Sequence, residues 1–184
     1  MVYSIKGLLI LLSFILLAGC APSAVAPVFF IPQNIQSVKK PLTPESLSVK
    51  VTLSESDVDA YITENNFKIA IEESIRQANL FGGDLNKPFM LMANVYKASF
   101  PSAGFTMTSQ LCAKYTLNDQ FLKEVWFKDI CYKGEATTSE AFIGSARAIL
   151  AFNRANHGHM TMLISSLRDF LETKDNLKTE EKKQ

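Results

Sequence analysis

Apolar and polar side chains alternate over residues 47–53, and this period of two predicts a half-buried strand. A helix is predicted next, because the apolar residues from Phe67 to Ala78 recur at intervals of three or four. Asn65 or Asn66 can cap that helix, since each side chain can accept a hydrogen bond from a free backbone N–H group. The patterned part of the chain therefore begins with a strand and a helix.

Three more strands are predicted between residues 88 and 133. Residues 89–96 are apolar on both faces, which is typical of a central strand. Residues 105–117 and 122–133 alternate again, and the turn-forming residues 118–120 separate them. We therefore expect these three strands to form an antiparallel meander.

The last patterned segment predicts one long helix. Apolar residues recur every three or four positions from Phe142 to Phe170, and the phase continues through Gly158. One of residues 137–139 can cap this helix, and Glu140 lies in its first turn, where the helix dipole favours a negative charge. We expect a continuous helix, straight or kinked at Gly158.

This order of elements predicts the fold class α+β. The order β-α-β-β-β-α forms a two-layer sandwich when two helices cover one face of a mainly antiparallel four-stranded sheet. We expect this domain to span residues 46–172. Residues 173–184 are almost wholly polar and charged, so we expect a disordered tail there.

A proline-rich segment precedes the domain. Residues 20–45 hold five of the seven prolines, and proline disfavours both helices and central strands. We expect a semi-extended tether that holds the domain about 50 Å or more from its point of attachment. The apolar stretch 28–31 interrupts the tether. It either packs on the domain or on a bilayer surface, or it docks a partner.

The first 20 residues have the layout of a secretory signal. Lys6 precedes an apolar run from Gly7 to Leu17, and small residues come directly before Cys20. The run is too short for a transmembrane helix, which needs about 20 residues. We therefore expect residues 1–19 to be a signal peptide.

Leu17-Ala18-Gly19-Cys20 resembles the lipobox of bacterial lipoproteins. The resemblance implies that Cys20 receives a diacylglyceryl group, that the signal is cut before it, and that labelled palmitate is incorporated. Two or three acyl chains would hold the protein at a membrane essentially permanently, because each buried methylene contributes about 0.8 kcal/mol. Ala21, in place of an aspartate, implies the outer membrane, with the domain facing the periplasm of the cell envelope.

The order of elements behind a lipobox resembles small Gram-negative envelope lipoproteins. The lipopolysaccharide-assembly lipoprotein and the auxiliary lipoproteins of lipid-exporting transporters are of this kind. The turn at residues 115–119 leading into Val125-Trp126, and residues 139–142 followed by Gly144 and Arg147, add to the likeness. The resemblance implies binding or assembly work rather than catalysis.

Composition and charge exclude one class of partner. Without residues 1–19 the chain keeps 165 residues, and its formal charge falls from +1 to 0 because Lys6 is the only charge removed. A neutral chain has no electrostatic basis for binding nucleic acid. The 13 phenylalanines supply bulk for a hydrophobic core.

Cys112 and Cys131 are the two cysteines left after Cys20 is assigned to lipid. Cys112 lies on the face opposite the odd-numbered apolar residues of its strand, and Cys131 lies opposite the even-numbered apolar residues of the next. Matching the apolar faces of an antiparallel pair puts both cysteines on the non-core face, opposed directly or diagonally. In an oxidising compartment they form a disulfide, or they remain two half-buried free thiols.

No motif in the sequence indicates catalysis or a cofactor. Neither a Gly-x-Ser-x-Gly motif nor a phosphate-binding glycine loop is present. Ser37 and Lys40 match Ser-x-x-Lys, but they lie in the tether, so the match is accidental. His157 and His159 are two positions apart on the predicted helix and point away from each other. We expect both to be solvated or partly packed, without a metal and without an enzyme activity.

Five soft apolar residues lie near the 101–104 turn, and methionine adapts to irregular partners. They are Met90, Met92, Phe100, Phe105 and Met107. They form either ordinary core or a groove for an acyl chain or partner helix between the sheet and the helices.

Three functions remain, and each requires a different structural feature. An accessory or assembly factor that binds another envelope protein, our first expectation, needs an exposed apolar patch on the sheet face away from the helices. A lipid-binding or lipid-transfer module, the alternative, needs an apolar cavity of several hundred Å³. An enzyme, the least favoured, needs a convergent polar cluster in a cleft.

Overall fold

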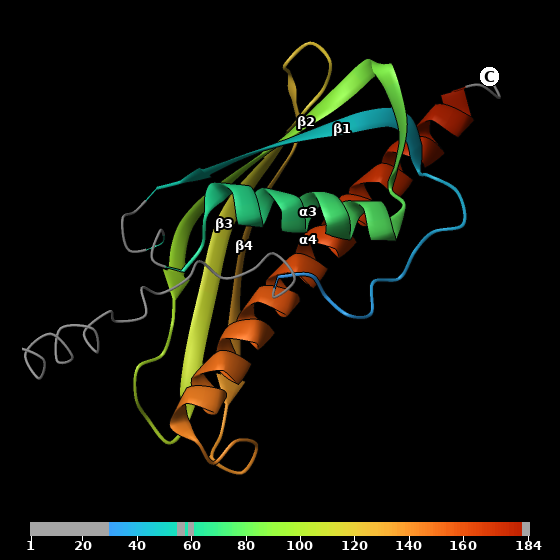
Figure 1. The fold of residues 1–184 in the computed structure, drawn as a ribbon. Coiled ribbons are helices and arrows are strands. Elements are labelled where there is room, and N and C mark those ends of the chain that lie inside the picture. Colours follow the sequence, from blue (N-terminus) through green and yellow to red (C-terminus); the bar gives the residue numbers. More distant parts are fainter. Residues whose placement is uncertain (1–29, 55–57, 59–60, 182–184) are drawn as a thin grey trace, which may run out of the picture.

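The computed structural model describes residues 30–54, 58 and 61–181, except for the side chains at 87 and beyond 174. Its elements follow the predicted order, strand, helix, three strands and helix (Figure 1). They are β1 (Thr43–Leu53), α3 (Glu64–Ala78), β2 (Phe81–Ser99), β3 (Met107–Asn118), β4 (Glu124–Ala136) and α4 (Gly144–Glu181).

The four strands form one sheet in the order β1-β2-β3-β4. The pairs β2–β3 and β3–β4 are antiparallel, which confirms the meander, but β1 and β2 pair in parallel. The predicted class α+β with two helices is confirmed, whereas the sheet is mixed rather than mainly antiparallel. The reason is the α3 crossover, which returns the chain beside β1 in the same direction.

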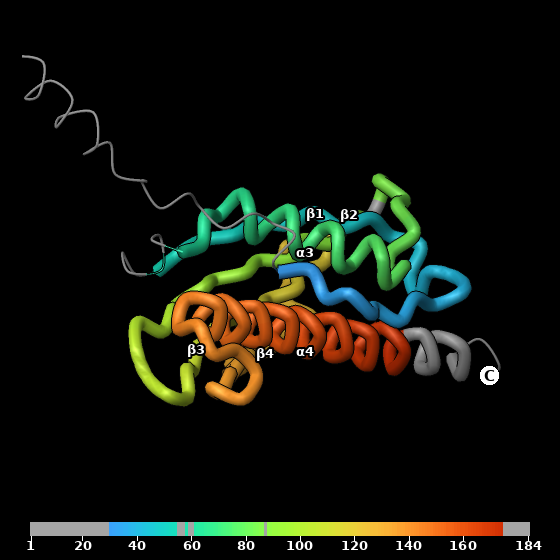
Figure 2. Tube along the Cα trace, turned by 60° about the horizontal axis from the view of Figure 1, so that its bottom comes forward, coloured from blue at the N-terminus to red at the C-terminus, as the bar shows by residue number. Residues whose placement is uncertain are grey.

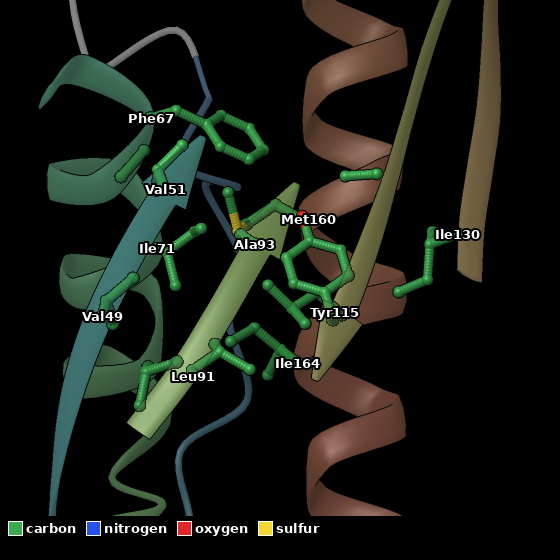
Figure 3. Close-up of a cluster of buried hydrophobic side chains, with 14 of the residues drawn as sticks. Val49, Val51, Phe67, Ile71, Leu91, Ala93, Tyr115, Ile130, Met160 and Ile164 are labelled. Atoms are coloured by element: carbon green, nitrogen blue, oxygen red, sulfur yellow. The ribbon is translucent and has the colours of Figure 1, made fainter. Parts of the chain in front are cut away.

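The core lies between the sheet and the two helices. Figure 3 shows side chains from β1, β2 and β3 meeting those of α3 and α4, with Tyr115 directed at α4. The largest fully buried side chains share this layer, and they include Phe67, Ile71, Leu91, Leu117, Ile130, Met160 and Leu163. Burial of this continuous apolar layer is the main favourable contribution to folding.

α4 packs against β4 at unusually short range. A Cβ atom on Gly134 would lie 2.2 Å from the Ala151 carbonyl oxygen and 2.2 Å from the Ala155 backbone nitrogen. A Cβ on Gly158 would lie 2.1 Å from the Tyr132 ring. α4 is continuous through Gly158, so this glycine admits the Tyr132 ring and does not break the helix.

The segment expected to be a free tether is partly folded. Residues 30–42 lie between α3 and α4 (Figure 2). Phe30 is fully buried, and its ring centroid lies 5.6 Å from that of Phe67 and 6.2 Å from that of Phe152. Backbone hydrogen bonds from Val38 to Ala78 and from Leu42 to Leu80 continue this packing. The predicted boundary at residue 46 is therefore wrong, and packing on the domain is the outcome at Phe30.

The helix boundaries also differ from the predicted ones. α3 is capped by Thr63, whose side-chain oxygen accepts a hydrogen bond from the backbone N–H of Asn66. α4 begins at Gly144, later than expected, and runs to Glu181. The predicted disordered tail is therefore helical as far as residue 181, because extending an existing helix adds a backbone hydrogen bond per residue and needs no new nucleus.

Candidate functional site

The structure describes the two cysteines of the predicted disulfide but not the predicted lipidation site. Cys20 lies outside the described residues. Cys112 and Cys131 are directly opposed in the β3–β4 register, with Cα atoms 4.1 Å apart, and a disulfide joins them. The apolar faces indicated that the two cysteines share a face, opposed directly or diagonally, and the register is the direct one.

The disulfide lies on the sheet face that the helices leave open. The Tyr96 hydroxyl donates a 2.9 Å hydrogen bond to the Asp129 carboxylate and lies 3.2 Å from the Cys131 sulfur. Partial burial, together with the Asp129 carboxylate, raises the pKa of Tyr96. The Lys114 amine lies 5.4 Å from the centre of the Tyr96 ring. Tyr96 thus contacts the disulfide directly, and Asp129 and Lys114 contact Tyr96.

The native, never-reduced protein should contain no free thiol at Cys112 or Cys131. Non-reducing mass spectrometry after alkylation in denaturant should find both sulfurs unlabelled, and prior reduction should expose two alkylatable thiols. Because the bridge closes a loop of about 20 residues, its loss should destabilise the fold. Two labelled thiols before reduction would contradict the disulfide.

His159 belongs to the core rather than to a reactive cleft. Its Nδ1 lies 3.2 Å from the Leu111 carbonyl oxygen, so Nδ1 carries the proton and donates. Nε2 then accepts from the Tyr115 hydroxyl at 2.7 Å. Burial lowers the pKa of His159 to about 4 and raises that of Tyr115 well above its usual range. The expectation of a solvated or partly packed histidine is wrong here, because folding encloses this face of α4.

His157 is only partly buried. Among the described residues, no three histidine, cysteine, aspartate or glutamate side chains lie close enough together to hold a metal ion. Within the same residues, no helix is long and apolar enough to cross a membrane.

The soft apolar residues near the 101–104 turn do not form one groove. Met107 is buried, while Met90 and Met92 lie on the open face of the sheet, because they pair with Asn118 and Thr116 there. Phe105 is 86% exposed. Alternation along β2 and β3 therefore separates these residues onto different surfaces.

Binding of a partner was expected to need an exposed apolar patch on the sheet face away from the helices. This open face does not carry a continuous apolar patch. One row across the sheet runs through Lys50, Met92, Thr116 and Phe127. The next runs through Thr52, Asn94, Lys114 and Asp129. Exposed apolar side chains on this face are thus interspersed with charged and hydroxyl groups.

Grooves open at several places on the described surface. One of about 320 Å³ lies between β1 and α3, and its lining includes Leu47, Val49 and Ile75 as well as the charged residues Glu72 and Arg76. Another of about 220 Å³ separates residues 34–36 from α4. The first is the nearest match to the cavity required for lipid binding. Residues 30–42 themselves occupy the space between the two helices.

Apart from Leu85 in β2, the most exposed large apolar side chains lie on loops at the two ends of the sheet. At one end, the β3–β4 turn exposes Phe121 by 78% and Leu122 by 71%. We call residues 118–123 the Phe-Leu turn. Leu122 has φ 61°, a left-handed conformation that costs a branched residue about 1 kcal/mol or more. The backbone bonds from Leu122 to Asp119 and from Asp119 to Lys123 account for this φ, because a short hairpin loop places a left-handed residue at that position.

Asp119 holds the Phe-Leu turn in this conformation. Its carboxylate accepts backbone hydrogen bonds from Phe121 at 2.9 Å and from Lys123 at 3.0 Å. Its backbone carbonyl accepts from Leu122, and its backbone N–H donates to the Lys123 carbonyl. The two apolar side chains are therefore presented by an ordered turn.

At the opposite end of the sheet, the loop between β2 and β3 lies near the loop between β4 and α4 (Figure 1). Phe105 lies between β2 and β3, while Phe142, 90% exposed, and Ile143, 67% exposed, lie before α4. We call these three residues the apolar tip. The late start of α4 produces it, because Phe142 would otherwise face the core from the helix.

Arg147 joins the two loops of the apolar tip. Its Nη1 donates to the carbonyl oxygens of Ala141 at 2.8 Å and Phe142 at 3.0 Å, and its Nη2 donates to that of Gly104 at 2.8 Å. The side chain is buried, with only 7% of the residue exposed. The sequence alone could mark Phe142 as apolar, but no signal in it indicated that Arg147 would bind both loops.

Structural similarity is detectable where sequence similarity is not. No family model matches the sequence, and no curated protein matches it significantly. Protein XCC0632 from Xanthomonas campestris, of family DUF330, has 12% identity and a TM-score of 0.58 over 85% of this chain and 97% of that one. Hypothetical protein CT253 from Chlamydia trachomatis has 5% identity and a TM-score of 0.50 over 70% and 98%.

A lipoprotein is also among the similar structures. Lipoprotein GNA1162 from Neisseria meningitidis has 14% identity and a TM-score of 0.30 over 70% of this chain and 96% of that one. This similarity is too low to support a functional argument. The first two similarities, at 12% and 5% identity, show a common fold and nothing finer.

Proposed function

We propose that this chain is a lipid-anchored outer-membrane lipoprotein that faces the periplasm and works without catalysis. It would serve as an accessory or assembly factor that binds another envelope protein. The lipobox at Leu17–Cys20 supports the anchor. The partner-binding surface is the Phe-Leu turn.

The observation that carries this proposal is the exposure of Phe121 and Leu122 on a turn that Asp119 holds in one conformation. Large apolar side chains at loop ends favour a protein partner, since aromatic residues in well-ordered positions often contribute most to binding. Lys123 and Glu124 follow the turn directly, so charged groups flank the apolar pair. An apolar centre beside a charged rim is the usual layout of a protein interface.

The structure favours this function over a lipid carrier or an enzyme. The groove beside β1 is of adequate size, but the charged residues Glu72 and Arg76 are among those that line it. The most strongly perturbed histidine, His159, is enclosed in the core and already bonded at both ring nitrogens. It therefore lacks the access to a substrate that acid–base catalysis requires.

A photo-crosslinking experiment tests the proposal in the full-length, membrane-targeted chain. A benzoylphenylalanine residue replaces Phe121, and in a matched control it replaces Ile149, which is also exposed but lies on α4. We expect one discrete protein adduct from position 121 and none from position 149. Leu122→Asp should remove the adduct without lowering the amount of protein.

Cys20→Ser supplies the control for the anchor. This variant should remain an unprocessed precursor without labelled palmitate, and its adduct at position 121 should be lost because the chain no longer reaches its membrane. Full palmitate labelling of Cys20→Ser would contradict the anchor. Equal adducts from positions 121 and 149, or none from 121, would contradict the binding surface.

A further inference from the structure

The attachment to the membrane is shorter than the proline-rich segment suggests. Phe30 is fully buried, so the chain is fixed to the domain from that residue onward. Only nine residues lie between it and Cys20, so the chain makes ten residue steps from one to the other. Even fully extended, ten residues span at most about 35 Å, which is less than the distance expected for a free tether. The domain must therefore remain close to the bilayer that holds the anchor.

The fixed point lies near one particular end of the molecule. Phe30 contacts Phe152, which is eight residues from the start of α4, or about 12 Å along the helix axis. The other end of α4, at Glu181, is about 44 Å beyond Phe152. From Phe30 the chain runs toward Arg168, whose guanidinium binds the Gln36 carbonyl. The end of the domain where α4 begins is thus the end nearest the anchor.

That same end carries the apolar tip. The two loops lie where α4 begins (Figure 1), and their residues Phe105, Phe142 and Ile143 are exposed. Residues 100–106 contain no charged side chain, and residues 137–143 contain only Glu140. Large apolar residues on nearly uncharged loops are suited to the apolar side of a membrane interface.

The one charge in these loops is neutralised within the fold. The Glu140 carboxylate accepts a 2.7 Å hydrogen bond from Arg154, and this hydrogen bond, with those from Thr137, lowers the pKa of Glu140 to about 2. The three described hydrogen bonds of Arg147 all go to carbonyl oxygens of the two loops. The tip therefore presents apolar groups from a preorganised frame, with no free carboxylate to repel anionic lipid.

We propose that the apolar tip inserts into the surface of the bilayer that holds the Cys20 lipid, so that α4 begins at the membrane and points away from it. This inference rests on the proposed anchor and adds an orientation to it. The Phe-Leu turn, at the opposite end of the sheet, is then turned toward the periplasm, where a partner can reach it. Lys123 and Glu124 beside that turn disfavour insertion there.

The test couples the chain to vesicles through Cys20 itself. The chain beginning at Cys20 reacts through that thiol with a maleimide phospholipid, while Cys112 and Cys131 are protected by their disulfide. The vesicles contain phosphatidylethanolamine, phosphatidylglycerol and brominated phosphatidylcholine, which quenches nearby tryptophan. In a Trp126→Phe background, Phe142→Trp reports on the tip and Phe121→Trp on the opposite end.

Brominated lipid should reduce the fluorescence of the Phe142→Trp chain about twofold or more, because interfacial side chains lie within reach of the bromine atoms. The Phe121→Trp chain should keep its fluorescence. No quenching at position 142, or equal quenching at both positions, would overturn the orientation. Chemical coupling replaces acylation, so these outcomes do not depend on the palmitate result that tests the anchor.

A triple substitution gives a second readout. Phe105→Ser, Phe142→Ser and Ile143→Ser together change only exposed side chains, so the fold should be retained. The triple variant is made in the chain that keeps Trp126, so the fluorescence of this tryptophan reports whether the variant is folded. Uncoupled Cys20→Ser chain should bind the same vesicles, and the triple variant should lose about tenfold or more in apparent affinity. Equal affinity of the two chains would overturn insertion of the tip.

Discussion

Gly134→Ala is expected to lower the free energy of unfolding by about 3 kcal/mol or more, because the added methyl group has no space. Its carbon would lie 2.2 Å from backbone atoms of both Ala151 and Ala155, and a helix backbone cannot rotate away as a side chain can. α4 would have to move off β4 and uncover the core beneath it. Thermal unfolding should show a midpoint about 10 °C lower than that of the parent chain.

Gly144→Ala is the matched control. A Cβ there would meet nothing closer than 3.7 Å, and alanine favours helix over glycine. This variant should be as stable as the parent or slightly more stable. Gly158→Ala should fall between the two, because the partly exposed Tyr132 ring can turn aside. An unchanged unfolding midpoint for Gly134→Ala would mean that α4 does not pack on β4 as described.

The free energy of unfolding should fall by about 3 kcal/mol between pH 6.5 and pH 4, and His159 should account for this loss. Burial holds the pKa of the folded ring near 4, while the unfolded ring has the ordinary value of 6.5. In this interval the unfolded chain binds a proton that the folded chain excludes, so acid favours unfolding. The stabilisation is complete above pH 6.5 and is lost as the pH falls through 4.

Urea titrations at several pH values, followed by Trp126 fluorescence, measure this dependence. His159→Gln should be less stable at pH 7, since it disturbs the bonds to Tyr115 and Leu111, yet its stability should change little between pH 6.5 and 4.5. His157→Gln, two residues away, should keep the parent slope. Glu73 and Glu140 have pKa values lowered to about 2, so their stabilisation is lost only at lower pH. A parent-like slope in His159→Gln would contradict the buried network.

The predictions from local sequence pattern were correct where the regular geometry of a strand or a helix fixes which face each side chain lies on. Side chains in a strand alternate strictly between two faces, so the parity of the apolar residues was enough to place Cys112 and Cys131 on one face. The short β3–β4 turn then left few registers, and the observed one opposes them directly. The helical face of α3 follows the predicted residues for the same reason, with Phe67, Ile71 and Ile75 buried.

Tertiary structure decided what depends on contacts between distant segments. Prolines in residues 30–42 disfavour regular structure, and this local rule holds, yet Phe30 enters the core because Phe67 and Phe152 provide an apolar site for it. The parallel β1–β2 pair depends on how the α3 crossover returns. Arg147 appears in the sequence as one more helical residue; its hydrogen bonds reach Gly104, 43 positions away.

By itself the sequence determined the order of the elements and the faces of the strands, and it supplied the lipobox-like motif on which the proposed anchor rests, because each follows from neighbouring residues. Only the tertiary structure decided that α4 begins late enough to expose Phe142, that the linker is fixed at Phe30, and that His159 is enclosed. Each of these features depends on contacts with a distant part of the chain. That part must supply the apolar surface, or the carbonyl oxygen, against which the side chain packs or to which it donates a hydrogen bond. Such partners are set by packing of the whole domain, and no local period encodes them.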